Sequence, residues 1–132
     1  MKKLLLGIAA VCLAGFTFAQ DAPLWMRHSV ISPDGTTIAF TYKGDIYTVP
    51  VAGGRAMQIT TNPAYDTAPV WSPDSKRIAF ASDRMGSLDV YIVAKDGGEP
   101  RRLTTHSGSE TPLAFTDAGH VLFSAGIMPS AE

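Results

Sequence analysis

Apolar residues in this chain occur in short runs separated by polar turns, and the same arrangement returns along the sequence. Residues 31–40 return as residues 71–80, with Ser-Pro-Asp followed by Ile-Ala-Phe in both. Later matches are shifted by 44 residues instead of 40, so the second copy carries four extra residues between Phe80 and Asp89. A third copy begins at Thr111 and runs to Phe123. A repeat of roughly 40 to 45 residues built from short strands is typical of a β-propeller blade.

The second copy shows the expected strands most clearly, at residues 69–71, 77–82, 89–94 and 101–104. Proline in the second position of the Ser-Pro-Asp turn presets φ, and serine and aspartate add local hydrogen bonds. The strands are apolar on both faces, so both faces must be covered, as happens when blades stack around an axis. No long window shows a helical apolar stripe, and nine prolines and twelve glycines disfavour helices.

The pattern therefore predicts an all-β fold made of β-propeller blades. We expect two complete four-stranded blades, at about residues 26–66 and 67–110, and part of a third blade at about residues 111–126. A closed propeller needs about four to eight blades. Residues 20–132 are thus expected to form a partial, incomplete β-propeller.

The first 19 residues have the pattern of a signal peptide. Lys2 and Lys3 precede an apolar run that ends near Phe18, and small residues then favour cleavage before Gln20. The run is shorter than the roughly 20 residues of a membrane span, although an uncleaved anchor is the alternative. Lipidation at Cys12 is disfavoured because Val11 is bulky. We expect an exported protein, periplasmic or extracellular.

Cleavage changes the composition in two ways. Cys12 is the only cysteine, so the mature chain would have no disulfide and no cysteine metal site. Losing two lysines leaves nine basic against twelve acidic residues, a net charge of −3 in place of −1. No basic run indicates a nucleic-acid partner, and no second apolar segment indicates a membrane partner.

Candidate catalytic residues are few. Ser107, Ser109 and Ser124 lack the flanking glycines of a nucleophile elbow. The histidines lack the spacing of a metal-binding pair, so surface or internally hydrogen-bonded roles are favoured over a zinc site. We expect two of them near strand edges and the third in a loop between blades: His28, His120 and His106.

Three aspartates, Asp34, Asp74 and Asp117, recur in register. They could form a ring of calcium or substrate ligands, but stabilisation of their own turns is the favoured interpretation. Asp45 and Asp89 are expected to anchor loops or hairpins. The neighbours Asp83 and Arg84 are expected to form a solvated turn pair worth about 0–1 kcal/mol.

The recurring aromatic residues are expected to fill the core rather than a ligand site. The recurrence places them at equivalent positions of successive blades. Trp25 lies outside the repeat and could pack on the propeller rim or line a closure seam. The recurring residues are Phe40, Tyr47, Trp71, Phe80 and Tyr91.

The second copy contains Pro-x-Trp-Ser-Pro-Asp, then Asp-Val-Tyr, Asp-Gly-Gly and Leu-Thr, and it resembles the TolB-type propeller repeat. The opening of the chain is more specific. Residues 23–27, 31–35 and 39–47 resemble the first blade of exported bacterial tricorn-like serine proteases. The third copy departs from the pattern, with Phe-Thr-Asp-Ala at residues 115–118.

The resemblance implies a non-catalytic N-terminal propeller segment that gates or binds peptide substrates for a parent peptidase. Its partners would be peptides or unfolded protein, together with downstream propeller and peptidase domains. The family's catalytic residues match no position in this chain, so the sequence assigns no catalytic residue, cofactor or metal. Two alternatives stay open: a TolB-like periplasmic binding or scaffold propeller, and the propeller of a prolyl-oligopeptidase-type hydrolase.

Overall fold

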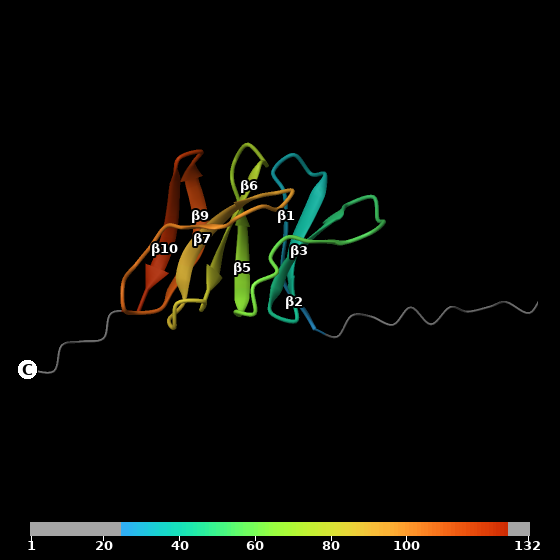
Figure 1. The fold of residues 1–132 in the computed structure, drawn as a ribbon. Coiled ribbons are helices and arrows are strands. Elements are labelled where there is room, and N and C mark those ends of the chain that lie inside the picture. Colours follow the sequence, from blue (N-terminus) through green and yellow to red (C-terminus); the bar gives the residue numbers. More distant parts are fainter. Residues whose placement is uncertain (1–24, 127–132) are drawn as a thin grey trace, which may run out of the picture.

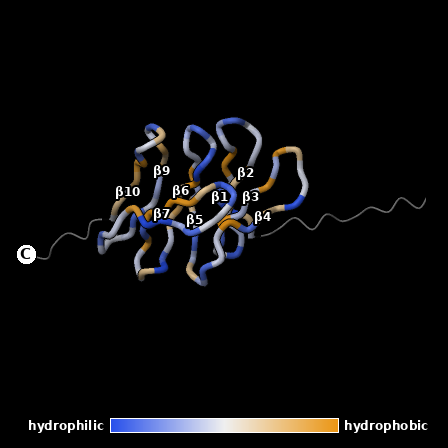
Figure 2. The backbone as a smooth tube through the Cα atoms, turned by 45° about the horizontal axis from the view of Figure 1, so that its top comes forward, coloured by the Kyte–Doolittle hydropathy of each residue, from blue (hydrophilic) through white to orange (hydrophobic). Residues whose placement is uncertain are grey.

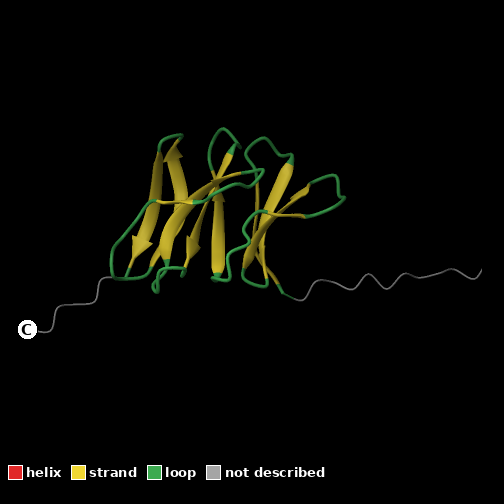
Figure 3. Cartoon of the chain, in the orientation of Figure 1, coloured by secondary structure: helices red, strands yellow, loops and turns green. Residues whose placement is uncertain are grey.

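The computed structural model describes residues 25–126, which form three antiparallel sheets and contain no helix (Figures 1 and 3). The all-β, incomplete-propeller prediction is confirmed, with two four-stranded sheets and one hairpin. The expected signal peptide, residues 1–19, and Cys12 lie outside the described residues. In spatial order the sheets contain β1 (Met26–Ile31), β2 (Thr37–Tyr42), β3 (Asp45–Pro50) and β4 (Met57–Gln58); β5 (Asp66–Trp71), β6 (Arg77–Ser82), β7 (Asp89–Ala94) and β8 (Arg101–Arg102); and β9 (Glu110–Asp117) with β10 (His120–Ala125). We call these sheets blade 1, blade 2 and the third hairpin.

Two strands of blade 2 differ from their predicted bounds. β5 begins at Asp66 rather than residue 69, because Asp66 and Thr67 pair with Ser82 and Ala81 of β6 ahead of a bulge in the ladder. β8 ends at Arg102 rather than residue 104, because the Thr104 hydroxyl accepts from the Val90 amide at 2.9 Å. A side chain there replaces the backbone carbonyl that would have extended the ladder.

The hairpins between the second and third strands differ in length. In blade 1, Lys43 and Gly44 both have positive φ, 51° and 88°, as a two-residue type I′ turn requires. A Cβ at Gly44 would lie 3.3 Å from Tyr65 Cδ2, so this position also needs a small residue. Blade 2 places its four extra residues in this hairpin, between β6 and β7.

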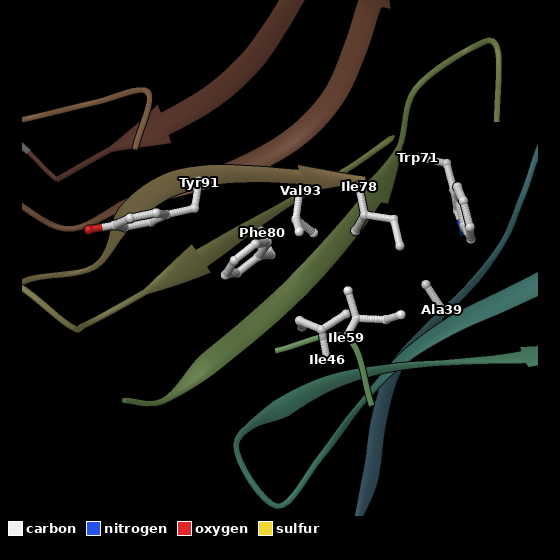
Figure 4. Close-up of a cluster of buried hydrophobic side chains, with 8 residues drawn as sticks. All are labelled: Ala39, Ile46, Ile59, Trp71, Ile78, Phe80, Tyr91 and Val93. Atoms are coloured by element: carbon white, nitrogen blue, oxygen red, sulfur yellow. The ribbon is translucent and has the colours of Figure 1, made fainter. Parts of the chain in front are cut away.

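Blade 2 packs its aromatic side against blade 1, as the cluster in Figure 4 shows. Side chains alternate along a strand, so one face of β6 and β7 presents Ile78, Phe80, Tyr91 and Val93. These side chains meet small and aliphatic side chains of blade 1, including Ala39, Ile46 and Ile59 (Figure 4). The inter-blade space is therefore the hydrophobic core.

The opposite side of blade 2 is built from small and aliphatic residues that face the third hairpin. Ala79 and Ala81 are fully buried, which permits close approach of the next sheet. Figure 2 shows hydrophobic residues along β6 and β7 and hydrophilic residues in the connecting turns. The blades thus stack in one direction, each with an aromatic and a small-residue face.

The first strands of the three sheets lie side by side, with β5 between β1 and β9. Trp71 fixes one of these contacts, because its indole N–H donates to the Val30 carbonyl at 3.1 Å. The first strands therefore form the inner edge of the three stacked sheets, which is the position of the central channel in a closed propeller.

Candidate functional site

An apolar groove of about 430 Å³ crosses the inner edge of the three stacked sheets, and we call it the inner-edge groove. Two of its side chains are strongly exposed, Ile31 at 58% and Leu113 at 55%. It contains no charged lining residue among those described. The groove is lined by Val30, Ile31, Pro33, Val70, Trp71, Pro73, Leu113, Ala114 and Phe115.

The Ser-Pro-Asp turns beside the groove hold their aspartates in local hydrogen bonds. Ser32 Oγ and the Thr36 amide donate to Asp34 Oδ1 at 2.5 and 3.0 Å. Asp74 accepts the equivalent two bonds in blade 2, at 2.6 and 3.1 Å. The Asp34 amide also donates to Ser75 Oγ at 3.0 Å, which joins the turns of the two blades.

Asp117 occupies a comparable turn in the third hairpin, where it accepts from the Gly119 amide at 2.7 Å and lies 2.9 Å from His120 Nδ1. Hydrogen bonds from Ser32 and Thr36 lower the pKa of Asp34, and the equivalent bonds from Ser72 and Lys76 lower the pKa of Asp74. The pKa of Asp117 is lowered by hydrogen bonds from the Gly119 amide and from His120. Within residues 25–126, no three histidine, cysteine or acidic residues are grouped to hold a metal ion. The contacts favour turn stabilisation over a shared ligand ring.

The three histidines occupy separate places. His28 lies in a bulge of β1 with φ 50°, and its Nδ1 is 3.1 Å from Thr67 Oγ1. His106, in the loop between the second blade and the third hairpin, accepts from the Gly108 amide at 3.1 Å. His120 pairs with Asp117, as described above. Each histidine therefore has its own local partner.

The three serines considered in the sequence analysis are not hydrogen-bond partners of the described histidines. Ser107 and Ser109 lie in the loop before β9, and Ser124 Oγ donates to the Thr111 carbonyl at 3.5 Å. Among the side-chain hydrogen bonds within residues 25–126, none joins a serine to a histidine.

Arg84 is the centre of a contact that the sequence interpretation missed. Its Nη2 lies 3.2 Å from both carboxylate oxygens of Asp66, which is completely buried, and its Nε donates to Ser82 Oγ at 2.9 Å. Its guanidinium carbon lies 4.4 Å from the centre of the Tyr91 ring. The expectation of a solvated Asp83–Arg84 pair is therefore wrong, because the longer hairpin of blade 2 folds Arg84 back onto its own sheet.

A second ionic contact lies at the same end of blade 2. Arg102 Nη2 is 2.8 Å from Asp89 Oδ2, and Asp89 is completely buried. The contact is an ion pair without hydrogen-bond alignment, since both Asp89 carboxylate oxygens lack a hydrogen-bond donor among the described residues. Burial raises the pKa of Tyr91, although Arg102 and Arg84 act in the opposite direction.

Blade 1 carries a neutral counterpart of this contact. Gln58 Nε2 donates to Asp45 Oδ2 at 3.1 Å, in the place where blade 2 has Arg102 and Asp89. Burial raises the pKa of Asp45, and the negative charge of Asp66 raises it further. The 44-residue shift of the repeat relates Gln58 to Arg102 and Asp45 to Asp89. This recurrence is the feature of the sequence from which the contact between the two positions could have been predicted.

Four of the aromatic residues that recur in the repeat are buried, as expected of core residues, whereas Tyr47 is half-buried. Phe40 stacks on Tyr47 and Phe80 on Tyr91, with ring centres 5.8 and 5.9 Å apart. Trp25, which the sequence left unassigned, is exposed and borders a separate groove of about 320 Å³ lined by Arg27, Thr41, Lys43, Gly44 and Tyr65.

A search of residues 25–126 finds no helix with the length and hydrophobicity needed to cross a membrane.

The chain resembles known proteins along most of its length. The family described as "Tricorn protease N-terminal beta propeller domain" matches residues 23–130. The chain is 35% identical over 102 residues to "Tricorn protease homolog 1" of Streptomyces coelicolor, covering 76% of this chain and 9% of that protein. It is 30% identical over 129 residues to "Uncharacterized peptidase YuxL" of Bacillus subtilis, covering 96% of this chain and 20% of that protein. The chain thus spans a small part of each relative's length.

The fold also resembles a solved propeller structure. The crystal structure of TolB from Acinetobacter baumannii superposes with a TM-score of 0.66 at 23% sequence identity. The superposition covers 76% of this chain and 26% of the TolB chain. At this identity the similarity concerns the fold alone.

Proposed function

Because this chain belongs to the tricorn protease N-terminal β-propeller family, we propose that it is a non-catalytic propeller segment of a larger tricorn-like serine peptidase. The described residues supply two blades and one hairpin, and a closed propeller needs about four to eight blades. In this proposal the remaining blades and the peptidase domain come from the rest of the parent protein. Residues 1–19 are its signal peptide, and the blades occupy about residues 26–66, 67–110 and 111–126.

The role that we propose for this segment is to bind peptide or unfolded protein on its way to the peptidase. The observation that carries the proposal is the inner-edge groove, which is apolar and lies where a closed propeller has its channel. Ile31 and Leu113 are exposed within one continuous apolar groove, and a continuous exposed apolar surface is typical of an interaction site. An unfolded chain offers apolar side chains that fit this groove without sequence specificity.

The binding role can be tested with fluorescein-labelled casein, an unfolded protein, and fluorescence anisotropy of the full chain. We expect Ile31→Gln and Leu113→Gln each to weaken casein binding by about three- to tenfold, because each removes apolar contact area from the groove. Met57→Gln is the matched control, because Met57 is similarly exposed but lies on the outer strand β4. Equal loss in all three variants would reject the groove as the binding site.

The parent protein and its location are tested by identifying the endogenous species. Antibodies or tryptic peptides from residues 25–126 should detect a protein far larger than 132 residues, in the exported fraction of the source cells. A species the size of this chain, or one confined to the cytoplasm, would contradict the corresponding part of the proposal.

Two other functions have an observation in their favour. The 44% identity over 55 residues with the "Tol-Pal system protein TolB" of Bordetella pertussis favours a binding or scaffold propeller without a peptidase. The identity with an uncharacterized Bacillus peptidase over 96% of the chain favours a propeller joined to another hydrolase type. Peptide mapping of the endogenous protein separates them, since a prolyl-oligopeptidase-type enzyme would carry a Gly-x-Ser-x-Gly nucleophile elbow.

A further inference from the structure

Two positively charged side chains lie together in a second groove, which borders the start of β1. This groove has a volume of about 320 Å³, and we call it the basic groove. Arg27 and Lys43 are exposed there, and within residues 25–126 neither forms an ion pair with a carboxylate. No acidic side chain is among the described lining residues, which are Trp25, Arg27, Thr41, Lys43, Gly44 and Tyr65. The groove therefore offers positive charge that the described part of the chain leaves uncompensated.

The basic groove lies where blade 1 meets the segment that leads into blade 2. Arg27 and Thr41 are paired across β1 and β2, and Tyr65 immediately precedes β5. The Tyr65 amide donates to Asp83 Oδ1 at 2.8 Å, and the Tyr65 ring lies beside Gly44. Both walls thus come from the first two blades, whose contact lies entirely within the described residues.

Thr41 brings a hydroxyl group without a partner to the groove. The residue is 2% exposed, and its Oγ1 is buried without a hydrogen-bond partner among residues 25–126. A buried hydroxyl that lacks a partner costs stability. The corresponding residue of blade 2 is Ala81, which pairs with Thr67 as Thr41 pairs with Arg27. Blade packing therefore does not require the hydroxyl, whereas a ligand oxygen in the groove would accept its hydrogen bond.

The two positive charges are also specific to blade 1. A shift of 40 residues relates Arg27 to Thr67 and Lys43 to Asp83. The same place in blade 2 thus holds one neutral and one acidic residue. A charge that every blade needed for folding would recur with the repeat, so these two basic residues are better explained by a ligand.

We propose that the basic groove binds the carboxylate of an aspartate or glutamate side chain in the polypeptide that occupies the inner-edge groove. Arg27 and Lys43 contact the carboxylate, and Thr41 Oγ1 donates to it, since charge-assisted hydrogen bonds are stronger than neutral ones. The rings of Trp25 and Tyr65 cover the apolar atoms beside it. The inference rests on the proposed function and adds a substrate class to it.

The spacing of the two grooves defines that class more closely. Arg27 of the basic groove and Ile31 of the inner-edge groove lie in the same strand, β1. At about 3.3 Å per residue they are at most about 13 Å apart, because a bulge interrupts the strand between them. An extended polypeptide would therefore contact both grooves when an acidic residue follows or precedes an apolar residue by about four positions.

Two peptides test the preference for an acidic side chain. Each is acetylated, amidated and labelled with a neutral dye, and each carries two leucines and, four residues away, either aspartate or asparagine. In anisotropy titrations with the full chain, we expect the aspartate peptide to bind about three- to tenfold more tightly. This preference should disappear in 1 M NaCl and in Arg27→Gln or Lys43→Gln. Arg55→Gln is the matched control, because Arg55 is an exposed basic residue of the β3–β4 loop.

Thr41→Val separates binding from folding, because valine keeps the shape of threonine and lacks the hydroxyl. We expect the variant to lose part of the preference for aspartate while its urea unfolding midpoint stays unchanged or rises. The midpoint should not fall, since Thr41 Oγ1 has no partner to lose among the described residues. A lower midpoint with an unchanged preference would assign the hydroxyl to folding and remove it from the site.

Three results would overturn the proposal. Equal binding of the aspartate and asparagine peptides would exclude recognition of the carboxylate, and a preference that survives both Arg27→Gln and Lys43→Gln would place it elsewhere. An asparagine peptide with a free C-terminus that binds as tightly as the aspartate peptide would show that the groove takes chain ends instead of side chains. In each case Ile31→Gln would still weaken casein binding if the proposed function holds, so the two failures are distinguishable.

Discussion

Replacing Arg84 by alanine gives the sharpest test of how blade 2 is held together. The substitution removes the ion pair with buried Asp66, the hydrogen bond to Ser82 and the guanidinium stacked on Tyr91. Asp66 then keeps a buried carboxylate with no charge partner among the described residues. Losing one member of a buried ion pair is far more costly than losing a surface pair, because the remaining charge is left desolvated.

The magnitude follows from how deeply the pair is buried. Breaking a fully buried ion pair costs about 3–5 kcal/mol. Arg84 retains 12% exposure, so water can enter its place in the variant and partly solvate Asp66. We therefore expect Arg84→Ala to lower the free energy of unfolding by about 2–3 kcal/mol. Urea unfolding followed by the fluorescence of Trp71, which is buried at the same blade interface, measures the change.

Two companion variants make the result specific. Arg55→Ala removes an exposed arginine of the β3–β4 loop and should change the unfolding free energy by less than about 0.5 kcal/mol. In a double-mutant cycle, Arg84→Ala combined with Asp66→Asn should cost less than the sum of the two single changes. An Arg84→Ala effect no larger than that of Arg55→Ala would refute the assignment of Arg84 as a buried structural residue.

Three further predictions follow from the turns and from blade packing. The pKa values of Asp34, Asp74 and Asp117 are lowered in the folded chain, so these ionised carboxylates stabilise the fold above their unfolded-state pKa. This contribution to the free energy of unfolding should disappear as the pH falls through the lower folded-state pKa values. Urea unfolding between about pH 5 and 2 measures the loss. Ser75 has φ 58°, so Ser75→Gly should be about 1 kcal/mol more stable than Ser75→Ala in urea unfolding, since both lose the bond to the Asp34 amide but only glycine relieves the backbone. Ala79→Leu should destabilise the chain by about 1–3 kcal/mol in the same assay, because Ala79 is completely buried and a larger side chain there must displace its neighbours.

The repeat made the architecture predictable from the sequence. The predicted strands at residues 77–82 and 89–94 coincide with β6 and β7, because turn residues bound each run of apolar residues on both sides. Recurrence also identified the core aromatic residues, since each blade fills the same space against its neighbour. The strands depend on local turn residues and the core aromatic residues on the repeat, and both kinds of pattern can be recognised in a single sequence.

The ionic contacts of blade 2 could not be predicted in the same way. Asp66 and Arg84 are 18 residues apart and meet only because the longer β6–β7 hairpin bends back over the sheet. In sequence, Arg84 follows Asp83 in a polar run, which is typical of a solvated turn. The four-residue insertion was visible, but its consequence depends on a backbone path that neither composition nor spacing specifies.

The two unlike faces of each blade give the assembly a direction. Blade 2 presents Phe80 and Tyr91 to blade 1, and Ala79 and Ala81 to the third hairpin, so successive blades join head to tail. Because side chains alternate, the equivalent stacked pair of blade 1 lies on its face away from blade 2. Head-to-tail contacts end only when a ring closes; otherwise they continue into open polymers. In the propeller that we propose, the aromatic face of blade 1 would therefore pack against a blade that presents small residues, as blade 2 presents Ala79 and Ala81 to the third hairpin.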